Sequence, residues 1–461
     1  MNLCSNRQPA PTSRRAMLQQ AGAGFGALAL HAMLAGNGLA ASKPAPKTAR
    51  AKRVIFVFMH GGPSSVDLFD PKPLLKRDAG KPLPLKEPRI VSHKTGNLLP
   101  SPWQFSRHGQ CGAPVSELLP HIGSIADDLC FIRSMHCSNS RHGGALLELH
   151  TGSDTFTRPA MGSWINYGLG SENDNLPGFI TINPSGSHGG AGAWSPAFLP
   201  ARHGGTRISG SGADMKIPFI ESPISKRKRQ LQEIDLIKSF NKDHLAKYGT
   251  DSELESRIAS YELAFRMQME VPGIQDFSNE PAHIKKMYGA DQAPTKGFAE
   301  QCMMARRFSE AGVRFVQITH RYWDSHSNLR KEHKKLSAEM DQPVAALITD
   351  LKQRGLLEDT LVLWGSEFGR TPTAQGKDGR DHNPHGFTMF MAGGGTKPGI
   401  QYGTTDDYGY YAQDNPVHFH DLHATILHLM GIDHELLTYR YAGRDFRLTD
   451  VHGNVVNRII A

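Results

Sequence analysis

The sequence predicts an α/β protein with a mostly parallel central sheet. Short, continuous apolar runs recur along the chain, each bounded by glycine, proline or polar residues, and longer segments of helical character separate them. Apolar runs without alternation are typical of strands buried on both faces. Strands that alternate with helical segments favour a parallel sheet with helices packed against it.

Six apolar runs are the predicted strands, at residues 54–59, 129–135, 179–182, 313–319, 361–364 and 387–391. Helices are predicted at 298–312, where Gly312 ends the pattern, and at 336–354 and 417–430. The charged segment at about 225–271 is poor in Gly and Pro and predicts a helical insertion. Residues 184–214 are dense in Gly, Ser and His, which predicts a loop.

The first 41 residues have the features of an export signal. Arg14 and Arg15 precede an apolar run at 21–34 and small residues at 38–41, the pattern of a cleavable signal. The paired arginines resemble the twin-arginine type, which is read as an export address. The apolar run is too short and glycine-rich for a stable membrane span. We expect a signal at 1–41, a linker at 42–52, one domain at 53–461, and a periplasmic or secreted protein.

The net charge of +8 does not indicate a nucleic-acid partner. Eight of the 52 Lys and Arg residues lie within residues 1–53, which contain no acid, so 44 basic residues face 44 acidic ones in the remainder. The body of the chain is neutral and shows no basic stripe or base-stacking motif. The sequence therefore excludes nucleic acid as the expected ligand.

Metal-ligating residues cluster where predicted strands end or begin. The first strand runs into a Gly-Gly turn and then acids, and the later ones are flanked by Asp324, His326, Glu367, Arg370, His382 and His385. Ligands bind at the carboxyl ends of strands in open α/β sheets, so we expect these side chains to converge. Carboxylates and imidazoles together bind Zn, Mn or Ca, and an arginine adds a bidentate clamp for an anion.

The segment after the strand at 129–135 offers candidate nucleophiles. Cys137, Ser138 and Ser140 directly precede a predicted helix. A thiol or hydroxyl there is well placed to attack an anionic ester, because the helix dipole and free amides stabilise the anion. The alternative is that one of the two serines only caps the helix.

Three phrases resemble the exported bacterial "domain of unknown function 1501" proteins of the alkaline phosphatase and sulfatase superfamily. They occupy residues 58–64 (FMHGGPS), 323–328 (WDSHSN) and 365–372 (GSEFGRTP). The resemblance covers the mature chain and implies a three-layer α/β/α sandwich with one or two divalent metal ions. It also implies attack on a phosphate or sulfate ester by a Ser, Thr or formylglycine.

The resemblance assigns metal ligands at seven positions. Asp324 and His326 match the Asp-plus-His pair of one metal, and Glu367 stands where the superfamily has an Asp. The superfamily places its early carboxylate directly after the first strand, where this chain has His60. The remaining implied ligands are Asp67 (or Asp70) as the early carboxylate, His60 as its substitute, and His382 or His385 as the late histidine.

The resemblance also implies catalytic residues. The run from Cys137 to Arg141 is similar to the sulfatase pattern Cys-x-Pro-Ser-Arg, with Asn139 in place of the proline. The nucleophile is therefore formylglycine made from Cys137, Cys137 itself, Ser138 or Ser140, or there is no covalent nucleophile. Arg141 and His142 are expected to hold the anionic group or protonate the leaving oxygen.

Three functions remain open from the sequence. The first is an exported metal-dependent hydrolase acting on an anionic ester, for which a sulfated or phosphorylated carbohydrate is one example. The second is a metal-binding or assembly protein on the same fold without turnover. The third is a serine esterase, suggested by His-Gly-Gly and by Gly365-Ser366, although the chain has Gly-Ser-x-x-Gly instead of the required Gly-x-Ser-x-Gly.

Overall fold

The computed structural model describes residues 49–86, 96–187, 190–210, 227–249 and 252–461. The expected signal at 1–41 and residues 42–48 of the expected linker lie outside these ranges. The end of that linker is already part of the core. Ala51 is fully buried and its N–H donates to the carbonyl of Leu429 at 2.9 Å.

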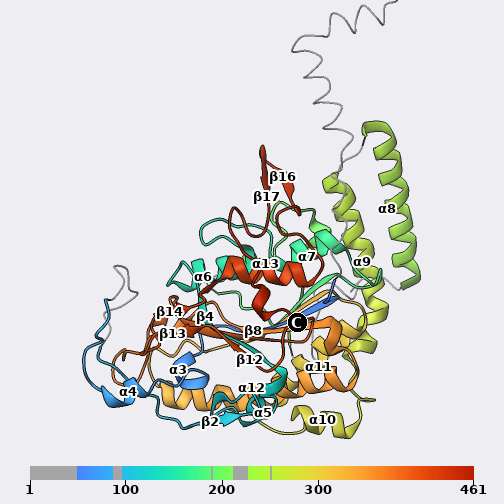
Figure 1. The fold of residues 1–461 in the computed structure, drawn as a ribbon. Coiled ribbons are helices and arrows are strands. Elements are labelled where there is room, and N and C mark those ends of the chain that lie inside the picture. The colour runs from blue at the N-terminus through green and yellow to red at the C-terminus, as the bar shows by residue number, and fades with distance from the viewer. Residues whose placement is uncertain (1–48, 87–95, 188–189, 211–226, 250–251) are drawn as a thin grey trace, which may run out of the picture. The chain divides into compact units, whose positions relative to one another are not determined.

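A nine-stranded sheet forms the centre of the described chain (Figure 1). Its order is β12 (Ile400–Tyr402), β4 (Cys130–His136), β11 (Phe387–Ala392), β8 (Thr360–Gly365), β1 (Arg53–Met59), β7 (Phe315–His320), β5 (Phe179–Ile182) and β6 (Thr206–Ile208), with β15 (Val417–His418) also paired to β4. Four two-stranded sheets add β2 (Phe105–His108) with β3 (Ala113–Ser116), β9 (Gly369–Arg370) with β10 (His382–Asn383), β13 (Thr404–Thr405) with β14 (Ala412–Asp414), and β16 (Tyr439–Tyr441) with β17 (Arg444–Phe446).

Helices alternate with strands along most of the chain, as expected of an α/β fold. They are α3 (Ser65–Leu68), α4 (Pro73–Arg77), α5 (Pro120–Ser124), α6 (His142–Thr151), α7 (Met161–Leu169), α8 (Arg227–Tyr248), α9 (Ser252–Gln275), α10 (Ala282–Tyr288), α11 (Lys296–Glu310), α12 (Leu329–Gln353) and α13 (Phe419–Leu429). In the part of the chain that the structure covers, none of these helices has the combination of length and apolarity that a bilayer crossing requires.

The central sheet is mixed, with one reversed strand. β1 pairs in parallel with β7 and β8, whereas β11 runs antiparallel to both β8 and β4. Consequently the carboxyl ends of β1, β4, β7 and β8 meet the beginning of β11 at one edge of the sheet. This reversal explains how residues that precede a strand can join residues that follow one.

Two hydrophobic cores lie on opposite faces of the sheet. Successive side chains of a strand point to opposite faces, and β1 places Phe56 in the core with α6, α7 and α13 but Val57 in the core with α11 and α12. Figure 1 shows α6, α7 and α13 on one side of the sheet and α5, α10, α11 and α12 on the other. The predicted α/β fold with helices on both faces is confirmed.

Two predicted segments have a different or fuller structure than the sequence suggested. Residues 184–214, predicted to be a loop, include β6, which pairs in parallel with β5. Its three residues are too few to produce a periodic signal, and pairing with β5 holds them extended. The predicted helical insertion at about 225–271 contains α8 and α9, and α9 continues to Gln275 with Pro272 inside it.

Candidate metal centre

Four side chains with ligand atoms come together at the sheet edge described above. They are His142 at the start of α6, Asp324 and His326 in the loop after β7, and His382 in β10. One nitrogen or oxygen atom from each lies within 4.8 Å of those of the others. We call these four residues the Asp324 cluster.

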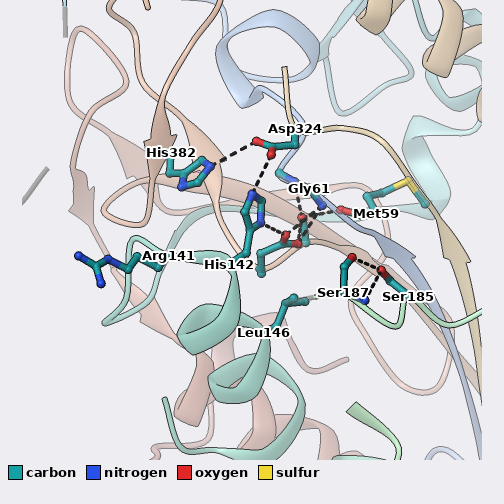
Figure 2. Close-up of polar contacts among 12 residues, drawn as sticks. Met59, Gly61, Arg141, His142, Leu146, Ser185, Ser187, Asp324 and His382 are labelled. Carbon is teal, nitrogen blue, oxygen red and sulfur yellow. Dashed lines mark hydrogen bonds and ion pairs between the residues drawn. The ribbon is translucent and has the colours of Figure 1, made fainter. Parts of the chain in front are cut away.

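Asp324 is the focus of the cluster. His142 Nε2 lies 3.1 Å from its Oδ2, and His326 Nε2 and His382 Nε2 lie 2.9 and 3.3 Å from its Oδ1. Figure 2 shows the rings of His142 and His382 turned towards this carboxylate. Its side chain remains 36% exposed, so the cluster is open to solvent on one side. Burial by itself would raise the pKa of Asp324, but the hydrogen bonds from the three histidines hold it well below its usual range.

The other ring nitrogen of each histidine has its own acceptor. His382 Nδ1 lies 2.7 Å from the carbonyl oxygen of Ser140, which can only accept, so this nitrogen carries the proton. His142 Nδ1 lies 2.7 Å from Glu367 Oε1, and His326 Nδ1 contacts the side-chain oxygen of Gln375. In proteins, histidines that ligate metals are oriented in this way by a partner on the distal nitrogen.

These contacts create an electrostatic requirement. With their protons on Nδ1, neutral histidines direct their Nε2 lone pairs at a carboxylate that is itself negative. Two such groups repel each other unless a proton or a cation lies between them. Burial lowers the pKa of His142, but its hydrogen bonds to Asp324 and Glu367 outweigh burial and raise it to about 9. Three imidazole nitrogens and one carboxylate oxygen that face one point form a donor set that fits a divalent metal.

Glu367 holds the cluster from behind and is not one of its four donors. It is fully buried, and its Oε1 accepts from Gly61 N–H at 2.9 Å as well as from His142. Ser366 Oγ lies 2.7 Å from its Oε2. Burial raises the pKa of Glu367, but the charges and hydrogen bonds of His142, His60 and Ser366 lower it to about 2. The sequence predicted a ligand here, and the structure places a carboxylate that orients His142.

The two glycines after β1 allow the loops to meet. Gly61 has φ +118°, and a Cβ there would lie 2.6 Å from the backbone nitrogen of Asp324. Gly62 has φ +83°, and a Cβ would lie 2.8 Å from the ring of Phe368. Only glycine tolerates both the positive φ and the close approach. The turn therefore brings Gly61 N–H to Glu367 and positions the loop that carries Asp324.

Arg370 does not form the anion clamp that the sequence predicted. It is 1% exposed, and its guanidinium donates to the carbonyl oxygens of Gly61, Gly62 and Arg380. Its Nη2 also lies 2.6 Å from Asp324 Oδ1. Each of its three nitrogens is hydrogen-bonded within the fold and the side chain is buried, so it does not present its guanidinium to a substrate. Its role in this fold is to fix the turn after β1 and to orient Asp324.

Three other predicted ligands are not brought into the cluster. Asp67 is fully buried and receives Arg380 Nε at 2.7 Å and Nη2 at 3.1 Å, so an arginine neutralises it. His385 instead stacks with Tyr410 and contacts the tilted ring of Tyr411. His60 lies beside the cluster, with its ring stacked on His142 at a centroid distance of 6.1 Å, but it is not among the four donors. Asp70, the alternative to Asp67, pairs with Arg133, Lys72 and Thr405.

The candidate nucleophiles differ in burial and in their contacts with the Asp324 cluster. Cys137 is 5% exposed, its Sγ contacts the carbonyl of Glu367 at 3.3 Å, and burial raises the pKa of its thiol well above the usual value. Ser138 is exposed and its Oγ lies 3.1 Å from His418 Nε2, outside the Asp324 cluster. Only Ser140 has its backbone bonded to a cluster histidine. Arg141 extends away from the cluster in Figure 2.

Sequence reasoning missed two supporting residues. Ser366 accepts from Gly62 N–H at 3.0 Å and reaches Glu367, and Gln375 contacts His326. His142, expected to hold the anionic group or protonate the leaving oxygen, lies among the four candidate donors of the Asp324 cluster. The sequence feature that could have indicated this placement is that His142 is the first residue of the helix that follows β4. Ser366 is 3% exposed, so it is not the presented nucleophile that a serine esterase requires.

The Glu367→Gln variant is expected to bind a divalent metal about 10- to 100-fold more weakly, because a neutral amide holds His142 less firmly than a carboxylate does. The measurement is a titration against a chromophoric chelator. Glu358→Gln, just before the opposite end of β8, is the matched control and should leave the affinity unchanged. Equal affinity in Glu367→Gln and the native protein would contradict the orienting role.

Comparison with known proteins gives a family and distant structural likenesses. The family model described as "Protein of unknown function (DUF1501)" matches residues 51–460. No curated protein matches the sequence. The fold is similar to Ps i-CgsB solved with k-i-k-neocarrahexaose (TM-score 0.39, 11% identity, 83% of this chain and 72% of that one). It is also similar to the PsFucS1 sulfatase from Pseudoalteromonas sp. (0.36, 13%, 89% and 71%) and to alkaline phosphatase from the Antarctic bacterium TAB5 (0.35, 9%, 82% and 98%).

Proposed function

Because the chain belongs to the DUF1501 family, whose description assigns no activity, we propose from the geometry of its site that it is an exported, divalent-metal-dependent hydrolase of phosphate or sulfate esters. One observation carries the proposal. Three imidazole Nε2 atoms converge on the carboxylate of Asp324 while their Nδ1 atoms face fixed acceptors. Several imidazoles and a carboxylate that face one solvent-accessible point are a common set of ligands in catalytic metal sites.

The donor set favours some metals over others. Three imidazoles and one carboxylate suit Zn or Mn better than Ca, which prefers an all-oxygen shell. A divalent cation held there would polarise an ester oxygen and neutralise charge that develops on the leaving group. Of the three metals expected from the sequence, Zn and Mn are therefore the ones to test first.

The chain's own residues prepare the site in three ways. Glu367, Ser140 and Gln375 fix the ring orientation of the three histidines. Arg370 fixes Asp324 from the buried side. The cluster also lies at the start of α6, whose positive end attracts an anionic substrate. Among the predicted nucleophiles, Ser140 is the residue whose carbonyl is hydrogen-bonded to a histidine of the cluster, and direct attack by water is the route that needs no side chain.

The proposed activity is tested with the purified mature protein loaded with Zn or Mn and a panel of aryl phosphates and aryl sulfates. We expect turnover on one of the two ester classes, its loss on treatment with a chelator, and its recovery when metal is restored. Turnover that survives complete metal removal would refute the role of the cluster. An intact metal load with no turnover on either class would favour the second candidate.

That second candidate is a metal-binding or assembly protein on the same fold. Two observations support it, namely that the Cys137 thiol is buried and that Arg370 is committed to backbone carbonyls. Neither side chain is then available for chemistry on an ester.

If the first candidate holds, carbohydrate carrying a sulfate or phosphate group is the substrate class to test. A periplasmic or secreted location is part of that first proposal.

A further inference from the structure

A second group of metal-ligating side chains lines a separate cavity. The cavity has a volume of about 550 Å³ and is bounded by Ser138, His418, His420, Asp421, Glu435, Val451, His452, Gly453 and Asn454. Glu148 of α6 lies against it, and one donor atom each from Glu148, His418 and His420 lies within 4.8 Å of the others. None of these three residues belongs to the Asp324 cluster.

The carboxylate of Glu148 is well placed to bind a cation. Glu148 is only 3% exposed, and its Oε1 lies 3.2 Å from His418 Nε2. Its Oε2 accepts from Ser138 N–H at 2.9 Å. Burial raises the pKa of Glu148, but the contacts with His418 and Ser138 outweigh it, so the group remains a carboxylate. A buried carboxylate in contact with an imidazole is half of a transition-metal site.

His420 presents a lone pair by elimination. Its Nε2 lies 3.1 Å from the carbonyl oxygen of Gly152, which only accepts, so Nε2 carries the proton. The neutral ring therefore has its lone pair on Nδ1. His420 is 9% exposed, and its ring centroid lies 4.8 Å from that of His418. A carbonyl on the distal nitrogen is the partner commonly found behind a ligating histidine.

His418 can supply the third donor when its ring proton moves to the other nitrogen, and this change gives up one long hydrogen bond. Its Nδ1 accepts from His420 N–H at 3.3 Å, a long hydrogen bond, so the neutral ring carries its proton on Nε2. A cation at Nε2 displaces that proton to Nδ1, and the long bond is given up. No proton is lost from the ring in this exchange. The ordinary alternative is that Glu148 and His418 form only a structural pair at the start of α13.

The charges around the cavity favour a cation over that alternative. The residues that bound it include the acids Asp421 and Glu435, and none of them is Lys or Arg, although Arg447, outside the lining, pairs with Glu435 at 3.3 Å and offsets its charge. His452 adds a further imidazole, stacked on His420 at 5.0 Å. A simple structural pair needs neither this cavity nor the further carboxylate of Asp421 and imidazole of His452 that line it. We propose that Glu148, His418 and His420 form a second site for a divalent transition-metal ion such as Zn²⁺, independent of the Asp324 cluster.

The two sites share a connecting loop but no donor. Ser138 contacts Glu148 and His418, whereas the carbonyl of Ser140 holds His382 of the Asp324 cluster. The loop between β4 and α6 thus has one residue at each site. The second site is tested by counting ions, which does not depend on any activity of the first.

The experiment measures bound Zn²⁺ per chain in the purified mature protein after saturation and removal of free metal. We expect two ions in the native protein, one in His420→Ala, one in Asp324→Asn and none in the double variant. His428→Ala, which removes an imidazole from the same helix outside the cavity, is the matched control and should keep two. Replacing Zn²⁺ with Co²⁺ should give visible absorption bands from both sites. In His420→Ala the bands of the second site should be missing.

A result of one ion in the native protein that is lost in Asp324→Asn and retained in His420→Ala would overturn the second site. If His420→Ala does not fold, His420→Gln and Glu148→Gln provide the same count with smaller changes of shape. Failure of the first site has a different signature, because Asp324→Asn would then retain the native number of ions while His420→Ala loses one.

Discussion

Replacing Asp324 with Asn is expected to lower the metal affinity of the cluster at least about 100-fold, since loss of an outer partner alone costs about 10- to 100-fold and Asp324 is the charged donor itself. Three Nε2 atoms and one guanidinium nitrogen lie within 3.3 Å of its oxygens. An amide keeps the shape but brings no charge to offset the cation. Any ester hydrolysis should fall with the metal content.

The measurement is metal content after dialysis together with a competition titration. Asp407→Asn is a suitable control, because Asp407 is an exposed acid outside the cluster. Unfolding curves are recorded for both variants, because Asp324→Asn also removes the charged partner of the buried Arg370, whereas Asp407→Asn should unfold like the native protein. If Asp324→Asn retained native affinity at the cluster, the assignment of the metal centre would be wrong, whatever the protein hydrolyses.

Replacing Asp67 with Asn is expected to lower the free energy of unfolding by about 3–5 kcal/mol, the usual cost of breaking a buried ion pair by removing one partner. Asp67 and Arg380 are both fully buried and are joined by two hydrogen bonds, at 2.7 and 3.1 Å. Without the carboxylate, the guanidinium would remain in the interior without a neutralising charge. Denaturant unfolding measures the effect.

The same pair predicts a pH dependence. Burial raises the pKa of Asp67, but the charge and hydrogen bonds of Arg380 outweigh it and lower the pKa below the ordinary value. A depressed folded-state pKa stabilises the protein fully above the unfolded pKa of about 3.9. That contribution is lost as the pH falls through the folded-state pKa. The Asp67→Asn variant should therefore lose less stability than the native protein on acidification below about pH 4.

A surface pair provides the matched control for Asp67. Asp445 and Arg440 lie 3.2 Å apart with side chains 55% and 67% exposed. Asp445→Asn should change the free energy of unfolding by less than about 1 kcal/mol, because exposed ion pairs contribute little. A similar small change in Asp67→Asn would mean that Arg380 finds other partners or solvent, and that the pair does not hold the loop after β1.

The positions of the strands were predictable because the signal is local. A buried parallel strand must be apolar on both faces, and 54–59, 313–319 and 361–364 all show this in the sequence alone. The acids and histidines that follow these strands could be placed at one edge of the sheet, because the carboxyl ends of parallel strands meet there. β6 gave no such signal, since three residues among Gly and Ser become a strand only through pairing with β5.

The roles of individual side chains were not predictable in the same way. Arg370 and His382 are cross-strand partners in the β9–β10 pair and both contact Asp324, yet only the buried Arg370 also donates to the carbonyls of the turn after β1. His385 lies only three residues from His382 and stacks with Tyr410. Spacing along the chain does not reveal which of two such residues faces a given point.

The amino-acid sequence by itself determined the α/β fold, the family and the sheet edge at which polar residues gather, because apolar patterns and strand ends are properties of short segments. Only the tertiary structure decided that His142 joins Asp324, His326 and His382, and that Arg380 neutralises Asp67 from 313 residues away. Those outcomes depend on side-chain direction and on contacts between distant loops. A buried charge pairs with whichever opposite charge the packed loops bring within reach.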